Sequence, residues 1–505
     1  MDTLPLELIH DTFKYLECNK YVFCYSSTRL LSVIKQFIPI QIYVNETIEN
    51  RISKKYFIYK NTKIDFNKIH YIVILKFHTD EMKINLNNSN IRHIISHSMF
   101  NPTYYIFPTK LRSLISSYSI DSDVIDTSEL LYLKCAVIVN NNYFPKLRKL
   151  VIVNVPHDLL LPPSIDTLYI YNSSSQFSIK IKHLVNLHKL SVFRHIEKTD
   201  YPENLKILKF MIMSNDQSII IPEGITSFTL ITIEVKKYTS PFFILNYPLS
   251  LTRIKVPILY FLTYKCVLDF KNSNIKTIVI TESNHVKFQD LPDKLETLIL
   301  KKQIIPNPLP KSIKQLTIHS QNINHPHITI LNLTIDGKSD LNIDVSHMKL
   351  IKLKINNESY DSSKSVIITL PHTLQYLKLN CIYKIYQLID NNCQLIYLDC
   401  NDVMLFPHEL FNIQTLRYIR FKGFYDEKIV FCSYIKYLEI DTSTGLWLRD
   451  ITVDLSSFTN LVKLVIPYRN TCVVNNVFPK SIQYVKIHED NIEIIPKWIK
   501  YVFIK

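Results

Sequence analysis

Glycine is scarce in this sequence, with only 4 glycines among 505 residues. The loops that cradle nucleotide phosphates need several glycines close together, so this scarcity excludes both the P-loop and the dinucleotide-binding loop. The 9 cysteines include no C-x-x-C pair. Because they are odd in number and scattered among aliphatic residues, they indicate reduced, buried thiols in a cytosolic or nuclear protein.

Signals for export, membrane insertion and catalysis are also missing. The N-terminus carries Asp2 and Glu7 and has no basic start followed by an apolar core, so we expect no signal peptide. The longest apolar run, near residues 258–262, is far too short to span a bilayer. There is no G-x-S-x-G, no H-E-x-x-H and no kinase-like set of motifs. We therefore expect a protein that is not an enzyme and uses no cofactor.

Metal-ligand patterns are incomplete. The nearest candidates are pairs without a third ligand: His93/His97, His325/His327 and Cys393/Cys400. The first pair would converge on a metal only in a helix, and its surroundings are typical of a strand. We expect no metal site.

The chain is basic, with a net charge of +15. Such a charge is compatible with nucleic acid or an acidic partner. However, the lysines are scattered, and there is no arginine-rich run, zinc finger or RNA-binding signature. A solvated surface is the simpler interpretation, with nucleic-acid binding as an alternative.

A short pattern recurs along most of the chain. In residues 309–318, Pro310 is followed by Ile313, Leu316 and Ile318, which lie three, six and eight positions later. The frame aliphatic-x-x-aliphatic-x-aliphatic returns about every 20 residues, which indicates a repeat array. We call the first aliphatic residue of each frame its anchor. The anchors lie at 69, 91, 111, 130, 147, 165, 187, 205, 225, 251, 275, 295, 313, 330, 350, 374, 395, 416, 435, 461, 482 and 499.

The frame predicts one short strand per repeat, with the second and third aliphatic side chains pointing into a shared core. A single repeat cannot fold alone, because ordering about 20 residues costs roughly 1–2 kcal/mol each in backbone entropy. Spacings of 17–22 residues leave little room for helices, so we expect extended or single-turn connections on the convex side. The fold predicted for residues 69–505 is a horseshoe of about 22 parallel strands, within an α/β repeat solenoid.

The frame resembles the strand of leucine-rich repeats. The recurrent form Leu-Pro-x-Ser-Leu/Ile-x-x-Leu resembles the FNIP-type repeats found beside F-boxes in some protists and giant viruses. The resemblance implies a protein-binding solenoid. Residues 41–68 form a basic segment that we interpret as a linker or capping layer.

Residues 1–40 have a different, helical pattern. Ile9, Phe13 and Leu16 lie on one helical face, and Pro5 suits a first helical turn. The segment resembles the opening of an F-box in Leu4, Pro5, Glu7, Leu8, Ile9, Phe13, Tyr15 and Leu16. F-boxes are three-helix modules that dock on the Skp-type adaptor of cullin–RING ubiquitin ligases. The resemblance implies that Leu4, Pro5, Leu8, Ile9 and Phe13 contact the adaptor. A simple helical cap on the solenoid is the alternative.

The concave face of the last seven repeats is rich in tyrosine. The positions two residues after the anchors are Tyr376, Tyr397, Tyr418, Tyr437, Lys463, Tyr484 and Tyr501. Four residues after the anchors lie Lys378, Asp399, Arg420, Glu439, Val465, Lys486 and Phe503. We interpret the six tyrosines with Lys378 and Arg420 as a partner-binding surface, because tyrosine is favoured in binding hot spots. A structural ladder of stacked rings is the alternative.

Earlier repeats have no such stripe. The positions two residues after their anchors include Lys149, Thr167, Lys189, Ile207, Ser227 and Arg253. Taken with the F-box resemblance, the sequence predicts a substrate-recruiting subunit of a cullin–RING ligase, in the cytoplasm or nucleus of its cell, or of a host cell if the protein is viral. A non-enzymatic binding scaffold is the alternative.

Overall fold

The computed structural model describes thirty segments of the chain. They are residues 40–44, 70–77, 84–85, 90–96, 105–121, 125–139, 144–154, 161–172, 181–192, 201–212, 218–232, 243–244, 247–256, 268–270, 273–281, 288–300, 309–319, 325–335, 341–358, 365–380, 384–389, 393–401, 413–422, 428–429, 433–441, 451–453, 455–466, 471–473, 477–487 and 495–504. Apart from Ile40, which begins a strand, the predicted helical module, with Leu4, Pro5, Leu8, Ile9 and Phe13, lies outside these residues.

The chain divides into two compact units, Met1–Leu251 and Thr252–Lys505. Within the described segments both units consist of strands and turns, without any helix. No described helix could therefore cross a membrane.

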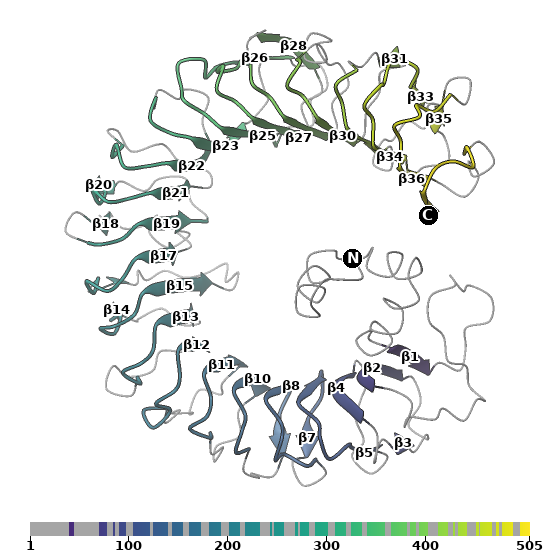
Figure 1. Ribbon diagram of the computed structural model, residues 1–505. Coiled ribbons are helices and arrows are strands. Elements are labelled where there is room, and N and C mark those ends of the chain that lie inside the picture. Colours follow the sequence, from purple (N-terminus) through teal and green to yellow (C-terminus); the bar gives the residue numbers. More distant parts are fainter. Residues whose placement is uncertain are drawn as a thin grey trace, which may run out of the picture. The chain divides into compact units, whose positions relative to one another are not determined.

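The main sheet of the first unit is parallel, and its strands pair in chain order (Figure 1). The first strand, β1, falls in the segment predicted as a linker or cap, and it pairs with β2. The strands are β1 (Ile40–Val44), β2 (His70–Phe77), β4 (Asn90–Ser96), β6 (Ser113–Ser116), β8 (Tyr132–Cys135), β10 (Lys149–Asn154), β11 (Thr167–Asn172), β12 (Lys189–Val192), β13 (Ile207–Ile212) and β15 (Ser227–Thr232).

The second unit repeats this arrangement, again with parallel pairing between successive strands of its main sheet. The strands are β17 (Arg253–Val256), β19 (Thr277–Ile280), β21 (Thr297–Leu300), β22 (Gln315–His319), β23 (Ile330–Ile335), β25 (Lys352–Asn357), β27 (Tyr376–Asn380), β29 (Tyr397–Asn401), β30 (Tyr418–Lys422), β32 (Tyr437–Asp441), β34 (Lys463–Ile466), β36 (Tyr484–Ile487) and β37 (Tyr501–Ile504).

Short parallel strands form a second layer in each unit. In Figure 1 they lie on the outer side, and the main sheet lies on the inner side of the same unit. In the first unit they are β3 (Ile84–Asn85), β5 (Tyr105–Ile106), β7 (Ile120–Asp121), β9 (Ile138–Val139), β14 (Ser218–Ile219) and β16 (Phe243–Ile244). In the second they are β18 (Leu268–Asp269), β20 (Phe288–Asp290), β24 (Leu341–Asp344), β26 (Ser365–Thr369), β28 (Lys384–Ile389), β31 (Lys428–Ile429), β33 (Ile451–Val453) and β35 (Thr471–Val473). These connections are extended, as the repeat length predicts.

The core lies between the two layers and is built from the repeated frame. Ile313, Leu316 and Ile318 are each 0% exposed. On the outer side, Ile343 and Ile368 are buried at 1% and 0% exposure. Burying an aliphatic side chain contributes about 1.5–3 kcal/mol, so stacked repeats can offset an entropy cost that one repeat cannot. The predicted parallel-strand, leucine-rich-repeat-like solenoid is confirmed in each unit.

Each proline of the frame lies in a β-turn. The amide of Ile313 donates to the carbonyl of Pro310 at 3.2 Å, and the next two amides, of Lys314 and Gln315, share the carbonyl of Glu296 at 2.9 and 3.1 Å. The turn uses the proline's carbonyl and needs no amide from it, so the missing N–H costs nothing.

The hydroxyl before the anchor joins neighbouring repeats. Ser312 Oγ donates to the carbonyl of Leu295, the anchor of the preceding repeat, at 2.7 Å. Equivalent bonds come from Ser164, Ser250, Thr373, Thr415 and Ser481. The serine of the recurrent Leu-Pro-x-Ser form therefore joins two layers.

One predicted anchor is wrong. At the anchor predicted at 330, the register pairs Leu331 with Leu316, and Ile328 is 0% exposed, so Ile328 is the anchor. The cause is an aliphatic run, Ile328–Ile335, that satisfies two overlapping frames. The anchor predicted at 69 lies outside the described residues.

Candidate functional site: a tyrosine ladder on the second unit

The tyrosine positions predicted from the frame share one row of the second unit's sheet. Register pairs Tyr376 with Tyr397, Tyr397 with Tyr418, and Tyr418 with Tyr437. Strands in a sheet lie about 4.8 Å apart, so residues at one register position form a column across the strands. We call Tyr376, Tyr397, Tyr418 and Tyr437 the tyrosine ladder.

The rings of the ladder contact one another. The ring centroids of Tyr376 and Tyr397 are 4.7 Å apart and their planes differ by 5°. Tyr397 and Tyr418 are 6.2 Å apart at 30°, and Tyr418 and Tyr437 are 6.1 Å apart at 41°. Tyr418 is still 42% exposed. The rings of the ladder thus contact one another in a column, and Tyr418 keeps an exposed surface.

Lysines continue the column at both ends. Lys352 Nζ lies 4.4 Å from the ring centroid of Tyr376. Lys463 Nζ lies 5.0 Å from the ring of Tyr437 and 4.5 Å from that of Tyr484. Each contact is a cation–π interaction of about 0.5–1 kcal/mol at exposed sites. Lys463 therefore joins Tyr484 to the ladder. Tyr501 pairs with Tyr484 through the backbone, and its side chain lies outside the described set.

A charged row runs beside the ladder, two residues further along each strand. Lys378 Nζ donates to Asp399 Oδ2 at 2.9 Å, and Asp399 is 4% exposed. Arg420 Nε lies 3.3 Å from Glu439 Oε1, an ion pair without hydrogen-bond geometry. The Tyr437 hydroxyl donates to Glu439 Oε2 at 2.7 Å. Both carboxylates of the row are therefore satisfied within the protein, and they hold Lys378, Arg420 and Tyr437 in place.

Three phenols of the ladder, those of Tyr376, Tyr397 and Tyr437, have raised pKa values and keep their protons at neutral pH. Burial, and then the charge of Asp399, raises the pKa of Tyr397 to about 12. Burial and the bond to Glu439 raise the pKa of Tyr437. Burial also raises the pKa of Tyr376 and of Tyr484. These phenols are therefore uncharged hydroxyl groups at neutral pH.

The first unit carries a smaller aromatic and basic cluster. Lys149 Nζ lies 4.6 Å from the ring of Tyr132 and 5.9 Å from that of Tyr169, and Lys189 lies 5.4 Å from Tyr169. Lys149 and Lys189 were expected on this face, but their ring contacts were not predicted. No ring stacks on another here, in agreement with the absence of a stripe from the described strands of this unit.

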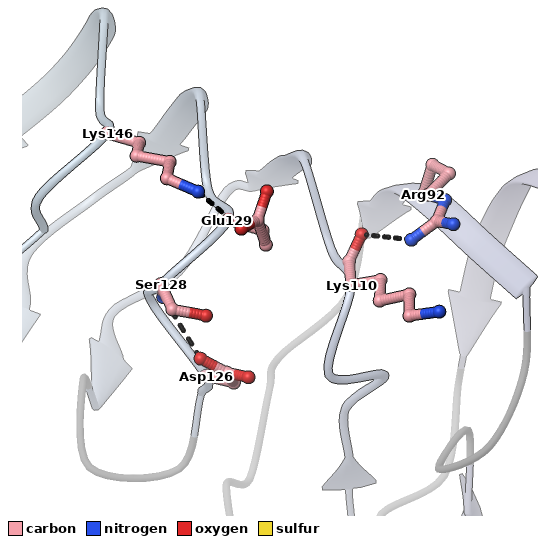
Figure 2. A network of polar contacts seen from close by, with 6 residues as sticks. All are labelled: Arg92, Lys110, Asp126, Ser128, Glu129 and Lys146. Carbon is pink, nitrogen blue, oxygen red and sulfur yellow. Dashed lines mark hydrogen bonds and ion pairs between the residues drawn. The ribbon is translucent and has the colours of Figure 1, made fainter.

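Polar contacts also join neighbouring turns of the first unit (Figure 2). Arg92 Nη1 donates to the carbonyl of Lys110 at 3.1 Å, and Lys146 pairs with Glu129 at 2.5 Å. The amide of Ser128 donates to Asp126 Oδ1 at 3.0 Å within one turn. The first two contacts connect adjacent repeats, and the three contacts do not converge on a shared point.

The described residues contain no cluster of three or more His, Cys, Asp or Glu that could hold a metal ion. The rings of His325 and His327 meet edge to face at 6.1 Å, and His93 lies in β4. Cys135, Cys393 and Cys400 are buried and form no disulfide bond. Burial raises the pKa of the Cys135 thiol to about 12, which keeps it protonated and unreactive.

No protein-family model matches the chain, and neither does any curated protein. Among solved structures, CroV588, a circular LRR protein, is similar over 98% of this chain and 68% of its own, at 16% identity and a TM-score of 0.39. YopM from Yersinia enterocolitica is similar over 78% of this chain and 82% of its own, at 14% identity and a TM-score of 0.36. An internalin (inlF) from Listeria monocytogenes is similar over 68% and 82%, at 12% identity and 0.25. The leucine-rich-repeat-like character of this chain rests on its own strand register and buried frame.

Proposed function

We propose that this protein is a non-enzymatic binding scaffold whose tyrosine ladder captures a protein partner. The observation that carries the proposal is a column of contacting tyrosine rings on one sheet face, with Tyr418 42% exposed. Tyrosine provides a large contact area at low entropy cost, and stacking lowers that cost further by fixing the rings before binding.

We further propose that residues 1–40 act as an F-box. In this proposal Leu4, Pro5, Leu8, Ile9 and Phe13 dock on a Skp-type adaptor, and the chain recruits substrates to a cullin–RING ubiquitin ligase in the cytoplasm or nucleus. The support is the N-terminal sequence pattern and its position before a repeat array. The alternative remains a helical cap on a plain scaffold.

The ladder is tested by partner capture from a cell extract with the full chain as bait. Changing Tyr397→Ser and Tyr418→Ser together is expected to abolish capture while leaving the circular-dichroism spectrum intact. Tyr434→Ser is the matched control, because Tyr434 is also 42% exposed but lies outside the ladder. A large fall in the melting temperature of the double variant would contradict the proposal. An equal loss of partner capture by the Tyr434→Ser control would also contradict it.

The F-box is tested separately with a purified Skp-type adaptor. The intact chain is expected to bind the adaptor. The variant with Leu4→Asp and Pro5→Ala is expected not to bind it, because both residues belong to the proposed docking segment. The Tyr397→Ser and Tyr418→Ser variant is expected to bind the adaptor normally. An intact chain that does not bind any Skp-type adaptor rejects the ligase role and leaves the scaffold.

A further inference from the structure

Both ends of the tyrosine ladder carry lysines. At one end Lys352 and Lys354 lie on β25, and Lys354 is in register with Lys378. At the other end are Lys463 on β34 and Lys486 on β36. We call Lys352 with Lys354, and Lys463 with Lys486, the two lysine pairs. Throughout the described segments, no carboxylate lies within ion-pair distance of these lysines.

Within each lysine pair, the two positive charges repel each other. Burial, followed by the charges of Lys352 and Lys378, lowers the pKa of Lys354, and Asp399 acts in the opposite direction. Burial also lowers the pKa of Lys463, where Glu439 acts in the opposite direction and Lys486 adds to the lowering. An anion placed beside either pair would relieve this repulsion, because opposite charges favour the charged form.

In the middle of the ladder face, the charged side chains are paired with one another. Asp399 is paired with Lys378, and Glu439 is paired with Arg420 and accepts a hydrogen bond from Tyr437. Uncompensated positive charge therefore flanks the ladder, while its centre presents tyrosine rings over neutralised ion pairs.

We infer that the ladder receives an extended protein segment with acidic residues at both ends and apolar residues between them. The inference deepens the proposed function and rests on it. From β25 to β34 there are five strand steps. At about 4.8 Å per step this span is about 24 Å. An extended chain covers it in about seven residues. The acidic groups reach the lysine pairs, and the apolar residues cover the rings.

A single-stranded nucleic acid fits this face less well. Bases bind such platforms by stacking on free aromatic faces, but the faces of Tyr376 and Tyr397 are occupied by each other at 4.7 Å. Each nucleotide also carries a phosphate, so the charge would continue over the carboxylates of Asp399 and Glu439. A segment that is acidic only at its ends avoids this repulsion.

The test uses fluorescence anisotropy with the full chain. The probe is a labelled peptide of about eleven residues, with two aspartates at each end and leucine and proline between them. A second peptide of the same composition has its four aspartates in the centre. We expect the first to bind at least about tenfold more tightly, which corresponds to about 1.4 kcal/mol. Lys352→Glu and Lys463→Glu should each weaken it about tenfold.

Matched variants separate this recognition from general charge attraction and from misfolding. Lys314→Glu makes the same charge change on the same unit, at an exposed position outside the ladder, and should leave binding unchanged. Lys486→Glu tests the second lysine pair without removing the ring contacts of Lys463. Equal binding of both peptides, equal weakening by Lys314→Glu, or tighter binding of a thymidine oligonucleotide of similar length overturns the inference.

Failure of this inference and failure of the proposed function give different results. If the peptide does not bind but the ladder variant still loses partner capture, the acidic segment is rejected and the scaffold stands. If the ladder variant captures its partner normally, the proposed function is rejected together with the inference.

Discussion

The phenol ring of Tyr376 lies parallel to that of Tyr397, with their centroids 4.7 Å apart and their planes differing by 5°. The distance is close to the strand spacing of about 4.8 Å, so the sheet register itself sets the stack. A double-mutant cycle with Tyr376→Leu and Tyr397→Leu should give a coupling energy of about 0.5–1.5 kcal/mol in urea denaturation. Tyr376→Leu with Tyr437→Leu, on strands that do not pair, should be additive. A coupling near zero in the first cycle would mean that the stack contributes nothing to stability.

The ion pair of Lys378 and Asp399 should stabilise the second unit. Lys378→Met leaves the carboxylate of Asp399, which is 4% exposed, without its cation. We expect the free energy of unfolding to fall by about 2 kcal/mol, less than for a fully buried pair because the Lys378 side chain is 27% exposed. Adding Asp399→Leu should restore most of the loss. The control is Lys276→Met, whose partner Glu296 is 46% exposed, with an expected change below about 1 kcal/mol. Equal losses in both variants would contradict the argument.

Tyr397 makes stability fall at alkaline pH. Burial and Asp399 raise the pKa of Tyr397 to about 12 in the folded chain. An unfolded tyrosine ionises near about 10. Between these values the unfolded chain releases a proton that the folded chain keeps, so the free energy of unfolding decreases as pH rises. The contribution of Tyr397 is complete below about pH 10. Tyr397→Phe should make the decrease in urea midpoint between about pH 10 and 12 shallower. Identical pH profiles would contradict this.

The repeat frame was predictable because its signal is periodic. Because the frame recurs in many repeats, it can be recognised even where one repeat departs from it. Leu316 lies in the predicted strand, which follows the turn of Pro310 and Ile313. The prediction fails where local sequence is ambiguous. Ile328–Ile335 offers aliphatic residues to two frames, and only the hydrogen-bond register with β22 selects one of them.

The sequence predicted which tyrosines share a row of the sheet, but it did not predict how their rings and the neighbouring lysines contact one another. Register position alone identifies the row of Tyr376, Tyr397, Tyr418 and Tyr437. Lys463 interrupts the row in the sequence, yet in space it bridges two rings, because a cation substitutes for a ring against an aromatic face. Lys352 likewise places its cation against the ring of Tyr376. Its position two residues after an anchor could have indicated that it lies in the same row.

The hydroxyl that precedes an anchor should contribute a measurable part of each interface between repeats. Ser312 Oγ donates to the carbonyl of Leu295 at 2.7 Å. Ser312→Ala should lower the free energy of unfolding by about 0.5–1.5 kcal/mol, as expected for one net hydrogen bond. Ser312→Thr keeps the hydroxyl and should retain most of the stability. Ser128→Ala is the control, because the structure gives Ser128 a bond from its backbone amide, which alanine preserves. An unchanged urea midpoint for Ser312→Ala would contradict the role of this bond.

Gly224 occupies a turn position that other residues adopt only with strain. Its φ is 87°, and the amide of Ile225 closes the turn on the carbonyl of Pro222 at 3.4 Å. A Cβ at this position would lie 3.6 Å from the carbonyl oxygen of Glu203, so there is space for it. The cost of Gly224→Ala is therefore conformational, about 1–2 kcal/mol in the free energy of unfolding. Gly224→Asn should cost less, because asparagine tolerates the left-handed region better than alanine. Hydrogen exchange of the amides in β13 and β15 reports the change locally. Equal protection in Gly224→Ala and the unaltered chain would show that the turn can adopt another conformation without loss.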